Sequence, residues 1–398
     1  MVAVADAMPE RVSPFWTLAF RPFFLAVGLW GVLAVAVWLL LLVSGGSLPS
    51  RFDQLGWHIH AMLFGFVFAA IAGFLLTAVA NWTGRRPVGG AMLMALAALW
   101  LLGRAACAFS AALPLWLAAL VDLAFPFAVA ALVLREILAA RSWRNLPMPL
   151  PVVILGLADL LVWLELGGID LPPGLGWRLG LAAVLTLISA VAGRIIPAFT
   201  RNWLMRHGAA RPYAPNRMLD RMASASLHTG LLGWAVFPTS RLVGVLLLVA
   251  AALNLWRLAN WQGWAVRREP LLLILHLGYL WVIAAAALLG GPTLIPAIPE
   301  AAAVHAGTSG AIGTMILGVM TRVARGHTGR PLRADAVTTA IYALAVSAGV
   351  VRVAAAFLPA LAMPLLTVSA AFWVGGYGLF VVAYAHMLVG ERADIRCR

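Results

Sequence analysis

The chain has 398 residues, of which 63% are hydrophobic and only 11% are charged. This composition excludes a soluble globular protein and indicates a polytopic membrane protein. The net charge of +14 does not indicate nucleic acid as a partner, because the 28 basic residues are all arginine and fall between apolar runs rather than on one face.

Apolar stretches of about 20 residues, the length that crosses ~30 Å of hydrocarbon, recur along the whole chain. The seventh and eighth are shorter than the others. The sequence therefore predicts an all-α polytopic bundle of about twelve transmembrane helices, over residues 23–44, 58–80, 90–110, 114–138, 150–167, 177–197, 222–237, 241–256, 270–290, 302–321, 336–358 and 362–388.

Arginine is concentrated in every second loop of this array. Groups of arginines, Arg257 among them, follow the second, fourth, sixth, eighth and tenth spans, whereas the opposite loops hold only Arg51, Arg178 and Arg241. By the positive-inside rule, the arginine-rich loops and both termini are cytoplasmic.

A single integral membrane domain is expected over residues 1–398, with cytoplasmic tails at 1–22 and 389–398 and a cytoplasmic loop at 198–221. Cys107 then lies near the outer face and Cys397 in the inner tail. The two cysteines are therefore expected to form no disulfide with each other.

Three histidines stand at the outer ends of two predicted spans. His58 and His60 begin the second span, and His305 begins the tenth. Imidazole inside a bilayer is costly unless something coordinates or pairs it, so these residues are candidate ligands; a position at the lipid headgroup level is the alternative. Two imidazoles at matched depth suit the axial positions of a haem iron, and His60 with His305 is the predicted pair. His58 is two residues from His60, so it points to another face of the helix and has another role.

The face below His60 is apolar, and the segment after His305 is a strip of glycines. The residues concerned are Phe64, Val67, Phe68 and Ile71, then Gly307, Gly310 and Gly313. Both surfaces suit a flat macrocycle, and both are also typical of close packing between membrane helices.

Charged residues inside the predicted spans form a second group of candidates. Arg104 in the third span and Arg352 in the eleventh lie about two turns inside the outer face, where a guanidinium needs an anion. Haem propionates are one such partner, and an ion pair of Arg104 with Asp122 is the alternative. Asp159 and Glu165 in the fifth span are candidates for a proton path or for local hydrogen-bond anchors.

Four segments carry a resemblance to a known family. They are WHIHAMLFGF leading to GFLLTAVANWTG between Trp57 and Gly84, GRIIPAFTRN at 193–202, LHLGY at 275–279, and VHAGTSGAIGTMILGVMTRVARGHTGRPL at 304–332. In these segments the chain resembles the NnrS family of haem- and copper-containing membrane proteins linked to nitric oxide and denitrification. The positions that match the family pattern are His60, Asn81, Arg104, Asp122, Arg194, Asn202, His276, His305, Arg322, His327 and Arg330. The family usually has Glu after the histidine of the second helix, where this sequence has Ala61.

The resemblance implies one or two haem b groups, with copper as a further metal, in a multi-pass protein of the bacterial inner membrane that binds or detoxifies nitric oxide. Copper prefers imidazole or thioether ligands, so the candidate ligands are His58 with Met62, or the inner-face pair His276 and His327, which would equally serve a second haem. Two alternatives stay open. One is a nitric oxide reductase fed by an unidentified electron donor, and the other is a twelve-helix transporter of a small solute or metal. The sequence does not indicate the oligomeric state.

Reporter fusions test the predicted topology. A reporter fused after Arg398 should behave as cytoplasmic, and one inserted near Ser50 as periplasmic, because the arginine-rich loops stay inside. Alkaline phosphatase and fluorescent-protein activities measure the side of each fusion. The reverse result at either point would remove the depth argument for pairing His60 with His305.

Overall fold

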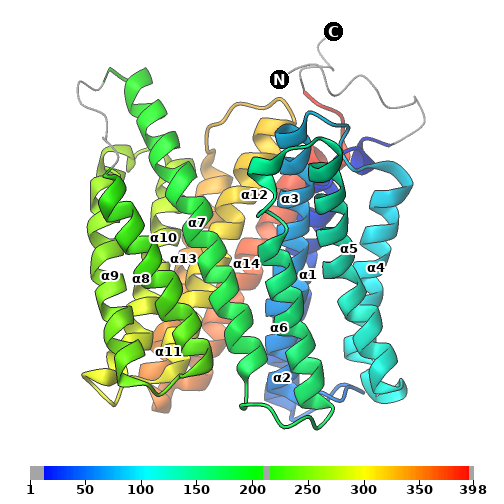
Figure 1. The fold of residues 1–398 in the computed structure, drawn as a ribbon, viewed down its shortest axis with the longest axis vertical. Coiled ribbons are helices and arrows are strands. Elements are labelled where there is room, and N and C mark those ends of the chain that lie inside the picture. Colours follow the sequence, from blue (N-terminus) through cyan, green and yellow to red (C-terminus); the bar gives the residue numbers. More distant parts are fainter. Residues whose placement is uncertain (1–12, 209–215, 394–398) are drawn as a thin grey trace. The chain divides into compact units, whose positions relative to one another are not determined.

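The computed structural model describes residues 13–208 and 216–393, and in these ranges it contains helices and no strand (Figure 1). Eleven of the described helical segments are long and apolar enough to cross a membrane. The predicted all-α, multi-pass membrane bundle is confirmed. Cys397 lies outside the described residues.

The helices form two compact units. The first comprises the described residues up to Gly180, Val323–Pro331 and the described residues from Val381 onward, and the second comprises the described parts of Leu181–Arg322 and Leu332–Phe380.

The first unit holds α1 (Phe20–Ser44), α2 (Gln54–His60), α3 (Val67–Thr83), α4 (Gly90–Ala108), α5 (Leu115–Ala139) and α6 (Leu150–Leu166). The second holds α8 (Arg217–Val236), α9 (Arg241–Asn260), α10 (Pro270–Gly290), α11 (Glu300–His305) and α13 (Ala336–Phe357). Three helices contribute residues to both units: α7 (Leu175–Arg206), α12 (Gly313–His327) and α14 (Ala362–Val389). Short 3₁₀ turns cover Pro14–Trp16, Ser110–Ala112, Trp143–Asn145, Gly263–Val266, Gly291–Thr293 and Pro359–Leu361.

Each unit is built by pairwise helix packing. In the first unit α5 packs against α3, α4 and α6, and α1 packs against α3. In the second unit α9 packs against α8 and α10, α10 against α11, and α11 against α13. Inside a bilayer such contacts depend on close van der Waals packing and on interhelical hydrogen bonds, since lipid is as apolar as leucine.

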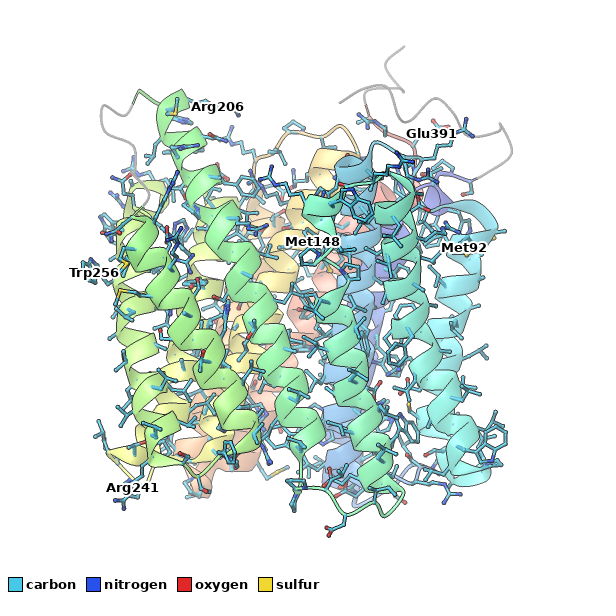
Figure 2. All side chains as sticks on the ribbon, in the orientation of Figure 1. Met92, Met148, Arg206, Arg241, Trp256 and Glu391 are labelled. Atoms are coloured by element: carbon cyan, nitrogen blue, oxygen red, sulfur yellow. The ribbon has the colours of Figure 1, made fainter. Side chains whose placement is uncertain are left out.

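The first and last helices meet within the first unit. Arg21, buried at the start of α1, donates from Nη1 to the carbonyl oxygens of Leu388 (2.9 Å) and Gly390 (2.6 Å) at the end of α14. Both described ends of the chain therefore lie at the same end of this unit, where Figure 2 also shows Met92 and Glu391.

All twelve predicted spans fall on helices, but the structure differs from the prediction in the character of the seventh span and in the loop before it. The predicted seventh span, 222–237, corresponds to α8, which is not among the eleven apolar segments because its first turns carry Arg217, Asp220 and Arg221. The predicted cytoplasmic loop at 198–221 is wrong over much of its length, since α7 continues through Pro197 to Arg206. The extra turns are held by packing, as Leu204 is buried against Val266 and Leu272.

Two of the predicted ligand histidines each stand directly before a π-helical stretch. α2 ends at His60 and is followed by a π-helical stretch, Ala61–Phe66. α11 ends at His305 and is followed by a second π-helical stretch, Ala306–Ile312. Wide turns of this kind are frequent at functional sites.

The glycine strip after His305 is covered by tryptophans. A Cβ at Gly310 would lie 2.5 Å from Cδ2 of Trp281, and Gly313 is approached as closely by Trp373. A Cβ at Gly349 of α13 would lie 3.1 Å from the Gly310 Cα, so the two backbones almost touch. At Gly310 and Gly313 the strip therefore serves close packing, which is one of the two roles that the sequence left open for it.

Substitutions of glycine test this packing. Gly310→Ala should destabilise the protein by about 1–3 kcal/mol, because the new methyl overlaps the Trp281 indole. Gly375→Ala is the matched control, since its Cβ would meet only Leu344 at an ordinary 3.7 Å. Thermal unfolding of the purified proteins in detergent measures both changes. Equal melting temperatures for the two variants would contradict the close packing at Gly310.

Candidate metal centre

His60 lies in a buried polar cluster formed by helices of the first unit. The side chain is 1% exposed, and its Nε2 lies 2.9 Å from Oδ1 of Asp159 and 3.0 Å from Oδ2 of Asp122. Asp122 comes from α5 and Asp159 from α6. The structure thus brings together three of the residues that the sequence singled out as candidates on three different spans.

Arg104 and Trp163 complete the surroundings of Asp122. Arg104 of α4 forms an ion pair through Nη2 with Oδ1 of Asp122, and Nε1 of Trp163 donates to Oδ2 at 3.0 Å. The ion pair that was the alternative to a haem propionate is therefore present. The cluster holds two carboxyl groups and one guanidinium, so a proton on His60 or on a carboxyl group, or a bound metal ion, balances its charge.

Cys107 belongs to the same cluster and was not predicted. It is buried in the last turn of α4, and its Sγ, a ring nitrogen of His60 and a carboxylate oxygen of Asp122 all lie within 4.8 Å of one another. The signal was available, because Cys107 follows Arg104 by three residues and so lies on the same helix face. Ser50 and Ser110 donate to the Cys107 carbonyl at 2.8 and 3.1 Å, which fixes the backbone there.

The donor set suits a transition-metal ion. Imidazole, thiolate and carboxylate together bind copper, zinc or iron, with imidazole and thiolate favouring copper. Nδ1 of His60, Oδ2 of Asp159 and both Nε and Nη1 of Arg104 are buried with no hydrogen-bond partner among the described residues. Such atoms are costly to bury, so the cluster is chemically incomplete without a further group.

The same surroundings do not fit a haem on His60. Its Nε2 already faces two carboxylates, and its ring is enclosed by Phe52 at 4.9 Å, Phe64 at 5.3 Å and Trp163 at 5.8 Å between ring centroids. The apolar wall below it is also filled, since Phe64 and Phe68 are buried and Phe68 packs on Phe125.

The remaining outer-face histidine of this unit is separate from the cluster. The ring of His58 stacks on Trp38 of α1, with centroids 4.2 Å apart and planes 25° apart. Two residues along the helix, His60 points instead toward α5 and α6. Glu165 accepts a hydrogen bond from the Gly174 backbone N–H at 2.9 Å, which fits the local anchor proposed as its alternative role.

His305 and Arg352 lie on packed helices of the second unit. Nδ1 of His305 is 2.7 Å from the Ala301 carbonyl, which sets the orientation of a half-buried ring. α11, which ends at His305, packs against α13, which carries Arg352. Within the described chain no carboxylate lies at ion-pair distance from Arg352.

The two predicted histidine pairs are each divided between the units. His60 belongs to the first and His305 to the second, while His327 belongs to the first and His276 to the second. His276 is buried with Nδ1 3.0 Å from the Leu272 carbonyl, and His327 packs on Phe20 with centroids 5.5 Å apart. The pairing of His276 with His327 stays a prediction, whereas the pairing of His60 with His305 around one haem does not agree with the enclosed ring of His60.

A second buried polar cluster lies in the second unit. Arg257, 5% exposed, donates to Oδ1 of Asp220 at 2.8 Å and to the Tyr279 hydroxyl at 3.0 Å, and this hydroxyl donates to Oδ1 of Asn254 at 2.5 Å. The prediction that Arg257 lies in a loop is wrong, because α9 continues to Asn260 and Asp220 neutralises the guanidinium. Periodicity alone could not reveal a partner on another helix.

A comparison with protein families explains why these features occur together. Residues 14–392 match the family described as NnrS protein. The chain belongs to the NnrS family. The match spans nearly the whole chain, so the resemblance carried by four sequence segments is confirmed. A comparison with curated proteins found no match.

One departure from the usual NnrS pattern now has a structural context. Ala61 stands where the resemblance leads us to expect Glu, and its carbonyl accepts a hydrogen bond from Nε1 of Trp30 at 2.9 Å. The carboxylates near His60 come instead from Asp122 and Asp159 on other helices. A carboxylate next to His60 is therefore retained without one at position 61.

The buried ion pair can be tested by comparison with an exposed one. Arg104→Met leaves the Asp122 carboxylate buried without its partner and should cost about 3–5 kcal/mol of stability. Arg135→Met is the control, because Arg135 is 57% exposed and its pair with Glu136 should be worth about 1 kcal/mol or less. Thermal unfolding in detergent compares them. Similar losses in both variants would contradict the assigned role of the Arg104 pair.

Proposed function

We propose that this NnrS-family protein is a metalloprotein of the bacterial inner membrane that binds and detoxifies nitric oxide, using a haem and a second transition-metal ion. The observation that carries the proposal is the buried set of His60, Cys107 and Asp122, whose ligand atoms lie within 4.8 Å of one another. The ion pair with Arg104 offsets part of the cost of burying this set, and a bound metal ion would satisfy the polar atoms that are left without a partner in the described chain.

The second metal ion is assigned to the His60 cluster. His60 and Cys107 would supply nitrogen and sulfur ligands, which favour copper, and Asp122 an oxygen ligand. Arg104 and Trp163 hold Asp122 in place, as outer-shell partners hold metal ligands in other proteins. Asp159 lies 2.9 Å from His60 and supplies the nearest additional carboxylate. This assignment replaces His60 as an axial haem ligand.

Haem is assigned to the second unit, with His305 as its ligand. The contact of His305 Nδ1 with the Ala301 carbonyl leaves Nε2 as the ligating atom, the usual arrangement of a metal-bound histidine. Arg352, on a helix packed against α11, is the matching partner for a propionate. When bound, haem supplies an iron to which nitric oxide coordinates.

Access of the substrate needs no polar channel. Nitric oxide is small and uncharged, and it partitions into the apolar interior of a bilayer. The aromatic side chains of Phe52, Phe64 and Trp163 around His60 give the cluster apolar surroundings of the same character as lipid. A site within the membrane therefore meets nitric oxide where it is concentrated.

Reduction of nitric oxide is a second candidate function, favoured by the two carboxylates at His60. Conversion of two nitric oxide molecules to nitrous oxide and water consumes two protons and two electrons, so it needs acidic groups at the site and an electron donor. Asp159, with one oxygen at His60 and the other without a partner in the described chain, is the residue placed to pass a proton. A transporter, the third alternative, would purify without colour.

Metal content and optical spectra of purified variants test the assignments. His305→Ala should lose the haem bands, because the iron loses its protein ligand. Cys107→Ala and His60→Ala should keep the haem bands and bind copper at least about tenfold more weakly. His207→Ala is the control, since this exposed side chain stacks on Trp203 away from both sites. Spectra before and after addition of nitric oxide show which variants still bind it.

Three outcomes would contradict the proposal. Loss of haem in His60→Ala would restore His60 as an axial ligand and refute its assignment to the second metal. Full copper content in Cys107→Ala would remove the thiolate from the site. A colourless wild-type protein would overturn the haem assignment altogether.

A further inference from the structure

A cavity of about 580 Å³ opens in the first unit beside the connection between α3 and α4. Arg85, Arg86 and Met92 line it from this connection and from α4, and Arg135 and Glu136 line it from the end of α5. It is separate from the His60 cluster, which is built from other residues of α4 and α5.

The cavity carries an excess of positive charge. Glu136 is buried and forms ion pairs with two arginines. Its Oε2 lies 2.6 Å from Nε of Arg85, and its Oε1 lies 2.7 Å from Nη2 of Arg135. Arg86 is exposed, and the side chains of Arg85 and Arg135 are 45% and 57% exposed. Three guanidinium groups and one carboxylate thus line the cavity, and only two of the guanidinium groups pair with the carboxylate, so the cavity suits an anion.

The start of α4 adds to the positive electrostatic potential of the cavity. Gly89, which lines the cavity, is the N-cap residue of α4, and no side chain accepts a hydrogen bond from the first turn, which also contains no acidic residue. By contrast, Asp53 caps α2 through the Gly56 N–H. The N-terminus of α4 therefore presents backbone N–H groups and the positive end of the helix dipole to the cavity.

The cavity adjoins a surface that faces lipid. Met92 is 45% exposed, and Leu134 and Leu138, on the same helix as Arg135, are exposed apolar side chains one turn apart. Figure 2 shows Met92 at the end of the first unit where Met148 and Glu391 also lie. The positive-inside rule assigns this arginine-rich end to the cytoplasmic leaflet.

We propose that the cavity binds the phosphate headgroup of an anionic phospholipid, with the acyl chains along the exposed apolar faces of α4 and α5. The phosphate oxygens accept hydrogen bonds from Arg85, Arg86 and Arg135 and complete the N-terminus of α4. Basic sites of this kind at the cytoplasmic ends of membrane helices are how proteins select anionic lipids. The lipid ties the α3–α4 connection to the end of α5.

Native mass spectrometry of the delipidated full-length protein in non-ionic detergent tests the proposal. The probes are dioleoyl phosphatidylglycerol, dioleoyl phosphatidylcholine and inorganic phosphate, each added separately. Phosphatidylglycerol should bind and phosphatidylcholine should not. The double variant R85Q/R86Q should bind phosphatidylglycerol about tenfold more weakly, because two cationic donors are removed. Arg144→Gln is the control, as this exposed arginine lies outside the cavity and should leave binding unchanged.

A second variant gives the opposite sign and does not depend on the first variant folding. Glu136→Gln removes the one carboxylate, so it should bind phosphatidylglycerol several-fold more tightly. Equal binding of the two lipids, an equal loss in Arg144→Gln, or weaker binding in Glu136→Gln would overturn the proposal. Inorganic phosphate that binds as tightly as phosphatidylglycerol, and is lost in R85Q/R86Q, would identify a site for a free anion and refute the lipid.

Discussion

The ion pair between Arg104 and Asp122 lies where the helices of the first unit meet. Asp122 of α5 is held by Arg104 of α4 and by Trp163 of α6, and it contacts His60 at the end of α2. A charge left alone in this apolar interior would cost several kcal/mol, so the four helices can pack only in the register that satisfies all of these groups. The same helix register places Cys107 in the cluster, since it stands one turn from Arg104 on α4.

The second unit also neutralises a buried arginine, with different residues. Arg257 is neutralised by Asp220, and the Tyr279 hydroxyl links it to Asn254. Its neighbours Trp261 and Tyr279 pack ring to ring with centroids 4.7 Å apart, which encloses the guanidinium. Hydrogen bonds join Arg257, Asp220, Tyr279 and Asn254 directly, so this cluster is a structural element, whereas the cluster at His60 combines unpaired polar atoms with a set of metal-binding side chains.

Hydropathy predicted the helices, because the length of an apolar run is set by the thickness of the bilayer and is readable in one dimension. The sequence also offered the ion pair of Arg104 with Asp122 as one of two alternatives, but it matched His60 in depth with His305 and not with this pair. Spacing places Cys107 on the same face of its helix as Arg104. Which helix faces meet is a three-dimensional property, so the contact of this face with His60, the proximity of Asp159 to His60 and the pairing of Arg257 with Asp220 could not be read from spacing. The glycines after His305 were ambiguous for the same reason, since a smooth strip accepts a tryptophan as readily as a macrocycle.

The contact between Arg21 and the end of α14 bears on how the protein is made. The guanidinium enters the membrane with the first helix, yet the carbonyls of Leu388 and Gly390 that accept its hydrogen bonds are synthesised about 370 residues later. At bacterial rates of elongation this interval is on the order of tens of seconds. During that time a cation at the start of α1 must be solvated by headgroups, by water or by an insertion factor. Packing of the end of α14 against α1 is thus a late step of biogenesis. The hydrogen bonds of Arg21 are among the last contacts that the growing chain can form.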